Sequence, residues 1–231
     1  MKNVHYYRAT LSQSLFETID GDALDAHSTA GADPRVERLR SDDDGRYFFL
    51  MAHRVARESE VLDPKSMKTE LRKTVEYEAA EFVVNFRERL VEVLTKRTHG
   101  AAVAAFLSKI APDDFLAETY DLDLPLVIET LRDAGLLANV LSLTWKVWDI
   151  KEGRIKRPTL EPADASEADK LLDNPGLSFV RCAVELTQPS RGDVLKISSN
   201  GSFGFKSDDP EGMEEIARRI ILAPMARHSE K

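Results

Sequence analysis

The segment from Glu81 to Ile110 constrains the fold most, because two β-rich runs are followed closely by a helical pattern. The runs at 82–86 and 90–94 flank a polar Arg-Glu-Arg triplet, which is the pattern of a β-hairpin. After a short break, the apolar residues of 101–110 recur at helical spacing. The segment therefore predicts a ββα unit. One long helix from Lys68 onward is the alternative, since Glu and Arg favour helices and no glycine interrupts the run.

The remaining sequence predicts further strands and helices, without internal repeats. Alternating or apolar runs indicate strands, and prolines or capping residues mark where helices begin. The stretch 20–44 is rich in Asp, Ala, Gly and Ser, and holds one short helix or little order. The predicted strands are 4–11, 47–55, 115–122, 136–150, 179–186, 194–197 and 203–206, and the predicted helices are 125–133, 166–172 with Ser166 as its cap, and one that begins at Pro210.

This order of elements predicts an α+β fold, in which antiparallel β-hairpins and ββα units pack with helices. We expect a main α+β lobe at 1–160, with the central hairpin and a basic strand end. A C-terminal lobe of β-hairpin and helix is expected at 161–231. A single undivided domain is the alternative.

Composition limits the class of protein. The chain has 231 residues, 42% hydrophobic and 31% charged, which is a globular balance. Cys182 is the only cysteine, so no intramolecular disulfide can form, and a reducing cytoplasm is the expected compartment. No run approaches the ~20 apolar residues that cross a bilayer. The net charge of -8 argues against a non-specific nucleic-acid coat, because the average field repels phosphate, so any DNA binding must be local.

A basic stretch at 145–157 stands against this acidic background. Its five cations outnumber two acids, Asp149 and Glu152, and such clusters interleaved with aromatics can bind nucleic acid. A solvated strand end is the alternative of equal weight. Trp145 and Trp148 alternate along the strand, so at most one of them joins an exposed face. The candidate DNA-binding residues are Lys146, Lys151, Arg154, Lys156 and Arg157.

No catalytic, metal-binding or cofactor-binding motif accompanies this stretch. The five histidines are scattered, and neither a P-loop nor a dinucleotide fingerprint occurs, so we expect no cofactor and no metal. One enzymatic alternative is a metal-dependent nuclease that uses Asp149 and Lys151, with Asp121 or Asp123 as a second acid. In the simpler reading, Asp149 is a surface residue that pairs with a neighbouring cation.

The order of several motifs resembles that of the RexA-like phage exclusion proteins, the cytoplasmic component of the lambda phage Rex system. These motifs span most of the chain. They are MKNVHYY, GRYFFLMAHR, EFVVNFRERLVEVLTKRTHGAAVAAFLSKI, WKVWDIKEGRIKR and VELTQPSRGDVLKISSNGSFGF.

This resemblance implies a non-catalytic, homodimeric sensor that binds double-stranded DNA in antiphage defence and acts with a membrane channel protein. It also implies that the basic segment after the central strand contacts DNA, which assigns that role to the five candidate cations. A third hypothesis is a protein-interaction module, because exposed hairpin edges could accept a partner strand and the acidic surface could dock a basic partner.

Overall fold

The structure, a computed structural model, describes residues 2–20, 24–29, 31–43, 45–62, 64, 67–96, 98–111 and 116–223. Residue contacts divide the chain into two compact units. The C-terminal unit consists of Met1–Arg8 and Glu118–Lys231, and the N-terminal unit consists of Ala9–Ala117. Both combine helices with antiparallel strands, so the mixed α and β content predicted from the sequence is confirmed.

The predicted boundary after residue 160 differs from this division, because it lies inside the C-terminal unit. Strand β7 (Leu137–Asp149) precedes that boundary, and β10 (Ser178–Leu186) follows it. The two strands pair antiparallel along most of their length. A boundary between them would divide one sheet.

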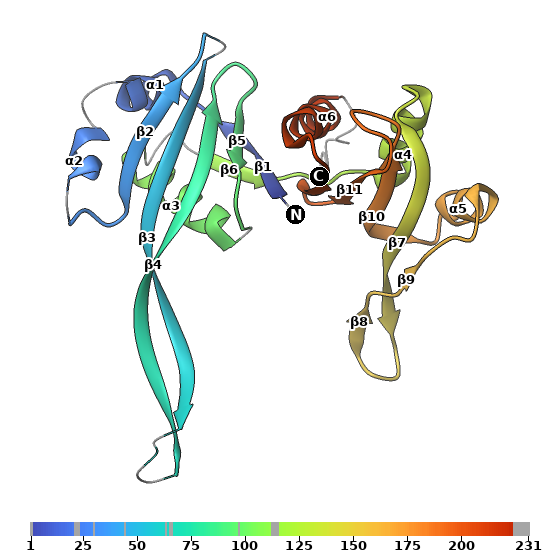
Figure 1. The fold of residues 1–231 in the computed structure, drawn as a ribbon, viewed down its shortest axis with the longest axis horizontal. Helices are drawn as coiled ribbons and strands as arrows, with labels where there is room; N and C mark the ends of the chain where they lie inside the picture. Colours follow the sequence, from blue (N-terminus) through green and yellow to red (C-terminus); the bar gives the residue numbers. More distant parts are fainter. Residues whose placement is uncertain are drawn as a thin grey trace. The chain divides into compact units, whose positions relative to one another are not determined.

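The N-terminal unit contains four neighbouring antiparallel strands and three helices (Figure 1). The strands are β2 (Arg35–Ser41), β3 (Arg46–Leu62), β4 (Thr69–Asn85) and β5 (Leu90–Val93), and the helices are α1 (Gln13–Asp20), α2 (Asp25–Ser28) and α3 (Thr98–Ile110). The stretch 20–44, for which one short helix or little order was expected, contains the short helix α2 and also β2, a strand that was not predicted. Residues 21–23, 30 and 44 of that stretch lie outside the described residues.

The predicted ββα unit is confirmed as β4, β5 and α3. Asn85 and Glu88 close its turn, because the Asn85 amide donates to the Glu88 carboxylate at 2.6 Å and the Glu88 backbone N–H donates to Asn85 Oδ1 at 3.0 Å. The ring of Phe82 stacks on Phe49 of β3 at 4.9 Å, and contacts Phe106 of α3 at 6.5 Å. The alternative helix from Lys68 is wrong, since those residues enter β4.

Strands β3 and β4 are longer than predicted, at 17 residues each. Their inner halves carry buried residues, whereas their outer halves are largely exposed. Figure 1 shows the outer halves as a two-stranded ribbon that extends away from the rest of the unit. This ribbon, Arg54–Leu62 paired with Thr69–Tyr77, is called the β arm below.

A buried histidine lies at the base of the β arm. His99, in the first turn of α3, has its Nδ1 at 2.9 Å from His53 Nε2 and its Nε2 at 3.3 Å from the Glu78 carboxylate. Burial is the main cause that lowers the pKa of His99, and His53 and Lys96 lower it further, whereas Glu78 raises it. Neutral imidazole is therefore the form that the fold favours.

This arrangement predicts a pH-dependent stability. Because the fold holds the pKa of His99 below its unfolded value of about 6.5, the unfolded state binds the proton first as pH falls. The stability that His99 contributes is complete above about pH 7 and is lost as the pH falls below the unfolded pKa of about 6.5. The free energy of unfolding should therefore fall more steeply with acidification below that pH in the parent protein than in His99→Gln. Urea denaturation at a series of pH values measures this difference, and parallel curves for the two proteins would contradict it.

The C-terminal unit is built on one antiparallel sheet in the order β1-β12-β11-β10-β7-β8, with β9 also paired to β7. Strand β6 (Leu116–Thr119) contains the point where the chain passes from one unit to the other. The further strands are β1 (Lys2–Thr10), β8 (Arg154–Lys156), β9 (Thr159–Leu160), β11 (Asp193–Ser198) and β12 (Ser202–Lys206), and the helices are α4 (Leu124–Asp133), α5 (Ala165–Leu172) and α6 (Pro210–Leu222).

Aspartates cap the three helices of this unit. Asp123 accepts a hydrogen bond from the backbone of Leu126 in α4, and Asp209 accepts one from Gly212 in α6. Helix α5 is capped by Asp164, which accepts from the Glu167 backbone at 2.9 Å. The predicted cap at Ser166 is therefore wrong by two positions, because Ala165 already lies inside the helix.

One face of this sheet is apolar and covered. Alternate residues of the central strands point to this face and are buried, and the Tyr6 ring packs edge-on against Phe203 at 5.6 Å. Helix α6 lies over the same face, because the Tyr6 hydroxyl donates to the backbone carbonyl of Glu214. Met213, Ile216, Ile220 and Ile221 of this helix are all buried.

Candidate nucleic-acid interface

The basic stretch forms a β-hairpin at the edge of the C-terminal sheet. Trp148 pairs with Ile155 and Thr144 with Thr159, and both pairs fit one continuous register. The Trp145 N–H donates to the Pro158 carbonyl at 3.3 Å, as the same register requires. Continued through Arg157, which lies between β8 and β9, this register places Lys146 opposite Arg157.

This register separates the five predicted cations. Side chains alternate between the two faces of a strand, so Lys146 and Arg157 share a face with Trp148 and Ile155. Arg154 and Lys156 point to the other face, and Lys151 lies in the turn. The basic stretch is therefore two groups of cations rather than one patch.

The cations on the other face are neutralised locally. Lys156 Nζ lies 2.6 Å from Asp149 Oδ2 and 2.9 Å from Glu152 Oε1, and Arg154 Nε lies 2.5 Å from Glu152 Oε2. The hydrogen bond from Lys156 is the main cause that lowers the pKa of the Asp149 carboxyl. These side chains stabilise the hairpin end, as the alternative of a solvated strand end predicts.

Lys146 and Arg157 present the opposite situation. Both are exposed, and neither has an ion pair within the described ranges. Like charges directly opposite each other destabilise a strand pair, typically by a few tenths of a kcal/mol to about 1 kcal/mol. A bound anion between the two side chains would remove this repulsion, so the pair is a candidate phosphate contact.

Three further cations point to the same face of the sheet. Arg181 pairs with Thr144, Lys196 with Ala183, and Lys206 with Val194. All three are exposed. The side of the C-terminal sheet that carries these residues together with the Lys146 and Arg157 pair is called the open face below.

Sequence reasoning missed Arg181, Lys196 and Lys206. Each occupies a polar position of an alternating strand, and that alternation was the available signal. What sequence could not provide was the pairing of β10 with β7, which brings Arg181 beside the basic hairpin.

The charge of the open face is opposite to that of the whole chain. Its strand residues include five cations and one acid, Glu185, which accepts a hydrogen bond from Asn139 at 2.7 Å. The whole chain carries -8. The open face therefore concentrates positive charge on one side of an acidic protein.

Polar and aromatic groups lie among these cations. The hydroxyls of Thr144 and Thr159 are 2.8 Å apart, and each can also bond to an anion. Trp148 is 61% exposed and stands beside Ile155. Trp145 lies on the other face and packs against Phe179 at 6.3 Å, so the prediction that at most one tryptophan joins an exposed face is confirmed.

The geometry does not support the nuclease alternative. Asp149 Oδ1 accepts hydrogen bonds from the backbone of Lys151 and Glu152, while Oδ2 contacts Lys156. Asp123 serves as a helix cap. Within the part of the chain that the structure describes, no group of three His, Cys, Asp or Glu side chains is arranged to hold a metal ion. Asp149 instead fixes the hairpin turn.

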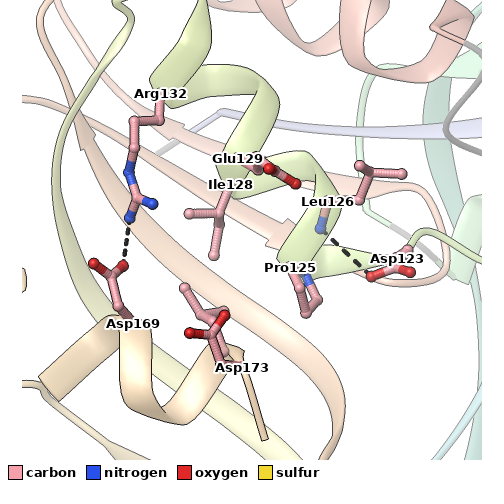
Figure 2. Close-up of a pocket in the computed structure, with 9 residues that line it drawn as sticks. Asp123, Pro125, Leu126, Ile128, Glu129, Arg132, Asp169 and Asp173 are labelled. Atoms are coloured by element: carbon pink, nitrogen blue, oxygen red, sulfur yellow. Dashed lines mark hydrogen bonds and ion pairs between the residues drawn. The ribbon is translucent and has the colours of Figure 1, made fainter. Parts of the chain in front are cut away.

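An acidic pocket lies between α4 and α5 in the same unit. Figure 2 shows Arg132 of α4 reaching toward Asp169 of α5, and their side-chain atoms are 2.6 Å apart. The pocket encloses about 410 Å³. Both members of this pair are about half exposed, so water satisfies much of their charge. We assign the pocket no ligand.

Comparison of the sequence with family models and with curated proteins gives no relative. No protein-family model matches the sequence, and no curated protein matches it. The described residues include no helix that is long and apolar enough to cross a membrane.

Repulsion between Lys146 and Arg157 is directly testable. Lys146→Glu converts a like-charge pair into an opposite-charge pair, and should raise the free energy of unfolding by about 0.5–1 kcal/mol at low salt. The gain should shrink at high salt, where the Debye length falls to about 3 Å at 1 M. Lys146→Gln removes only the repulsion and serves as the control, with a smaller gain. Chemical denaturation measures all three proteins, and a loss of stability in Lys146→Glu would refute the repulsive pair.

Proposed function

We propose that the protein binds double-stranded DNA through the open face and does no chemistry of its own. The observation that supports this most is the Lys146 and Arg157 pair, two opposed cations without an acidic partner among the described residues. Opposite charges on facing residues stabilise a strand pair, as Asp149 opposite Arg154 illustrates. Two facing cations do not stabilise the sheet, so stability alone does not explain them.

The spacing of the sheet suits a phosphate backbone. Strands lie about 4.8 Å apart, and residues on one face repeat about every 7 Å along a strand. Lys146, Arg181 and Lys196 therefore form a row of point charges across three strands, which can track successive phosphates. The exposed Trp148 and Ile155 add an apolar contact for sugars or base edges.

Little sequence preference is expected from such a surface. Specific readers usually place a helix or a β-ribbon in a groove with side chains that pair with base edges. The open face offers mainly Lys and Arg, which contact phosphates. Because the chain is acidic overall, binding should be local and strongly sensitive to salt.

The wider role that we propose is that of a cytoplasmic, homodimeric DNA sensor in a phage exclusion system, acting with a membrane channel protein. This part of the proposal is supported by the resemblance of the ordered sequence motifs. It is compatible with a site that binds an anion and holds no catalytic group.

The test compares two triple variants for binding to a labelled random-sequence duplex. Replacing Lys146, Arg181 and Lys196 by Ala should weaken binding, and should flatten the dependence of log affinity on log salt by about 0.9 per lost phosphate contact. Replacing Lys151, Arg154 and Lys156 by Ala removes the same formal charge from the turn and the ion-paired face, and should change the slope much less. Fluorescence anisotropy at several salt concentrations measures both variants.

Three results would overturn the proposal. Absence of duplex binding by the parent protein at low salt would exclude the DNA-binding role, and equal losses in the two variants would exclude the open face as the site. Cleavage of the duplex in the presence of Mg²⁺, seen on a denaturing gel, would exclude a non-catalytic protein.

A further inference from the structure

The β arm carries a strip of exposed apolar side chains on one side. The paired residues of β3 and β4 alternate between the two sides of this ribbon, so every second pair shares a side. Four large apolar residues fall on the same side, and each is more than half exposed. They are Leu62 (54%), Leu71 (69%), Val75 (63%) and Tyr77 (60%). With Arg54, Ala56, Glu58, Glu60 and Lys73, which alternate onto the same side, they form what is called the arm strip.

The other side of the β arm carries ion pairs and none of the described large apolar residues that are more than half exposed. Arg57 lies 3.2 Å from Glu76 and also pairs with Glu78. A two-stranded ribbon is at best marginally stable in water by itself, and exposed contiguous apolar surface usually marks an interface. The arm strip is thus the side of the ribbon that lacks cover.

The charges of the arm strip indicate what covers it. Arg54 and Lys73 balance Glu58 and Glu60, so the strip is formally neutral. Within its own chain Arg54 lies 3.4 Å from Asp33 and donates to the Tyr77 hydroxyl at 2.9 Å, and Lys73 pairs with Glu58. Glu60 is thus the one charged residue of the strip without an ion pair among the described residues. A neutral strip does not attract DNA phosphate, and it does not select a strongly acidic or basic partner. A strip that carries apolar residues and charges of both signs along its length can instead pair with the same strip of a second chain that runs in the opposite direction.

We propose that a second copy of this chain packs its arm strip against this one, with the two β arms running in opposite directions. A two-fold axis at the level of the Arg57 and Thr74 pair then brings Arg54 of one arm over Glu60 of the other, and Leu71 over Tyr77. Each contact occurs twice, as a two-fold interface requires. Lys73 already pairs with Glu58 at 3.0 Å within one arm, so the centre carries no net charge.

This proposal gives an interface to the homodimer of the proposed function and rests on that part of it. It is independent of the open face, because the arm strip and the open face share no residue. If the arm strip is not the interface, DNA binding by the open face is unaffected, whereas a monomeric protein would also overturn the homodimer of the proposed function.

Cysteine cross-linking tests the opposed packing. Leu71→Cys combined with Tyr77→Cys places thiols six residues apart on one strand, about 20 Å, which is too far for a disulfide within a chain. Mild oxidation should therefore give covalent dimers. Cys182 should stay unreactive, because burial raises the pKa of its thiol to about 12. Glu70→Cys with Glu76→Cys is the matched control, with the same spacing on the other side of the arm, and should remain monomeric on a denaturing gel.

A charge exchange tests the same interface without cysteines. Glu60→Arg should raise the dimer dissociation constant by about tenfold or more, because two Arg54 contacts become repulsive. Adding Arg54→Glu to that variant should restore much of the affinity, measured by sedimentation velocity.

The outcomes separate the possibilities. A protein that sediments as a monomer at every concentration overturns both the interface and the homodimer. A dimer that survives Leu71→Glu and gives no cross-link places the interface elsewhere and overturns only the arm strip. Thr74→Glu, on the ion-paired side of the arm, should leave dimerisation unchanged.

Discussion

The alternation of side chains in the C-terminal sheet is the constraint on which the candidate site depends. Apart from the register shifts where β10 pairs with β7, one residue in two points toward the covered face, where Leu143, Cys182 and Ile197 are buried. The residues between them must point to the open face, and there they include Arg181 and Lys196. The apolar core thus decides which cations are exposed together, and a slip of one residue in any strand would exchange the two sets.

The same alternation divides the cations of the basic stretch between an ion-paired face and a face without ion pairs among the described residues. Lys156 and Arg157 are neighbours in the chain, yet one lies 2.6 Å from the Asp149 carboxylate and the other stands opposite Lys146. A count of charges along the sequence adds these residues together. The hairpin separates them, so the ion-paired face stabilises the turn while the open face keeps its positive charge available to an external anion.

Single helices and hairpins could be predicted from the local sequence, whereas pairings between distant strands could not. The ββα unit and α6 were predictable from spacing, polar turns and Pro210. Residues 69–78 are rich in helix formers and nevertheless form a strand, because cross-strand ion pairs such as Lys73 with Glu58 stabilise the ribbon. The unit boundary and the position of Arg181 depend on the pairing of β10 with β7, which no local pattern contains.

The two proposed surfaces should respond differently to salt, so salt should separate dimerisation from DNA binding. The arm strip is formally neutral and mainly apolar, so screening should change its association little. The open face acts through Lys and Arg, so its affinity for phosphate should fall steeply as salt increases. A dimer joined through the arm strips carries two open faces, and a duplex bound to one raises the effective concentration of DNA at the other wherever the geometry allows both to engage. High salt would then release DNA from a protein that stays dimeric.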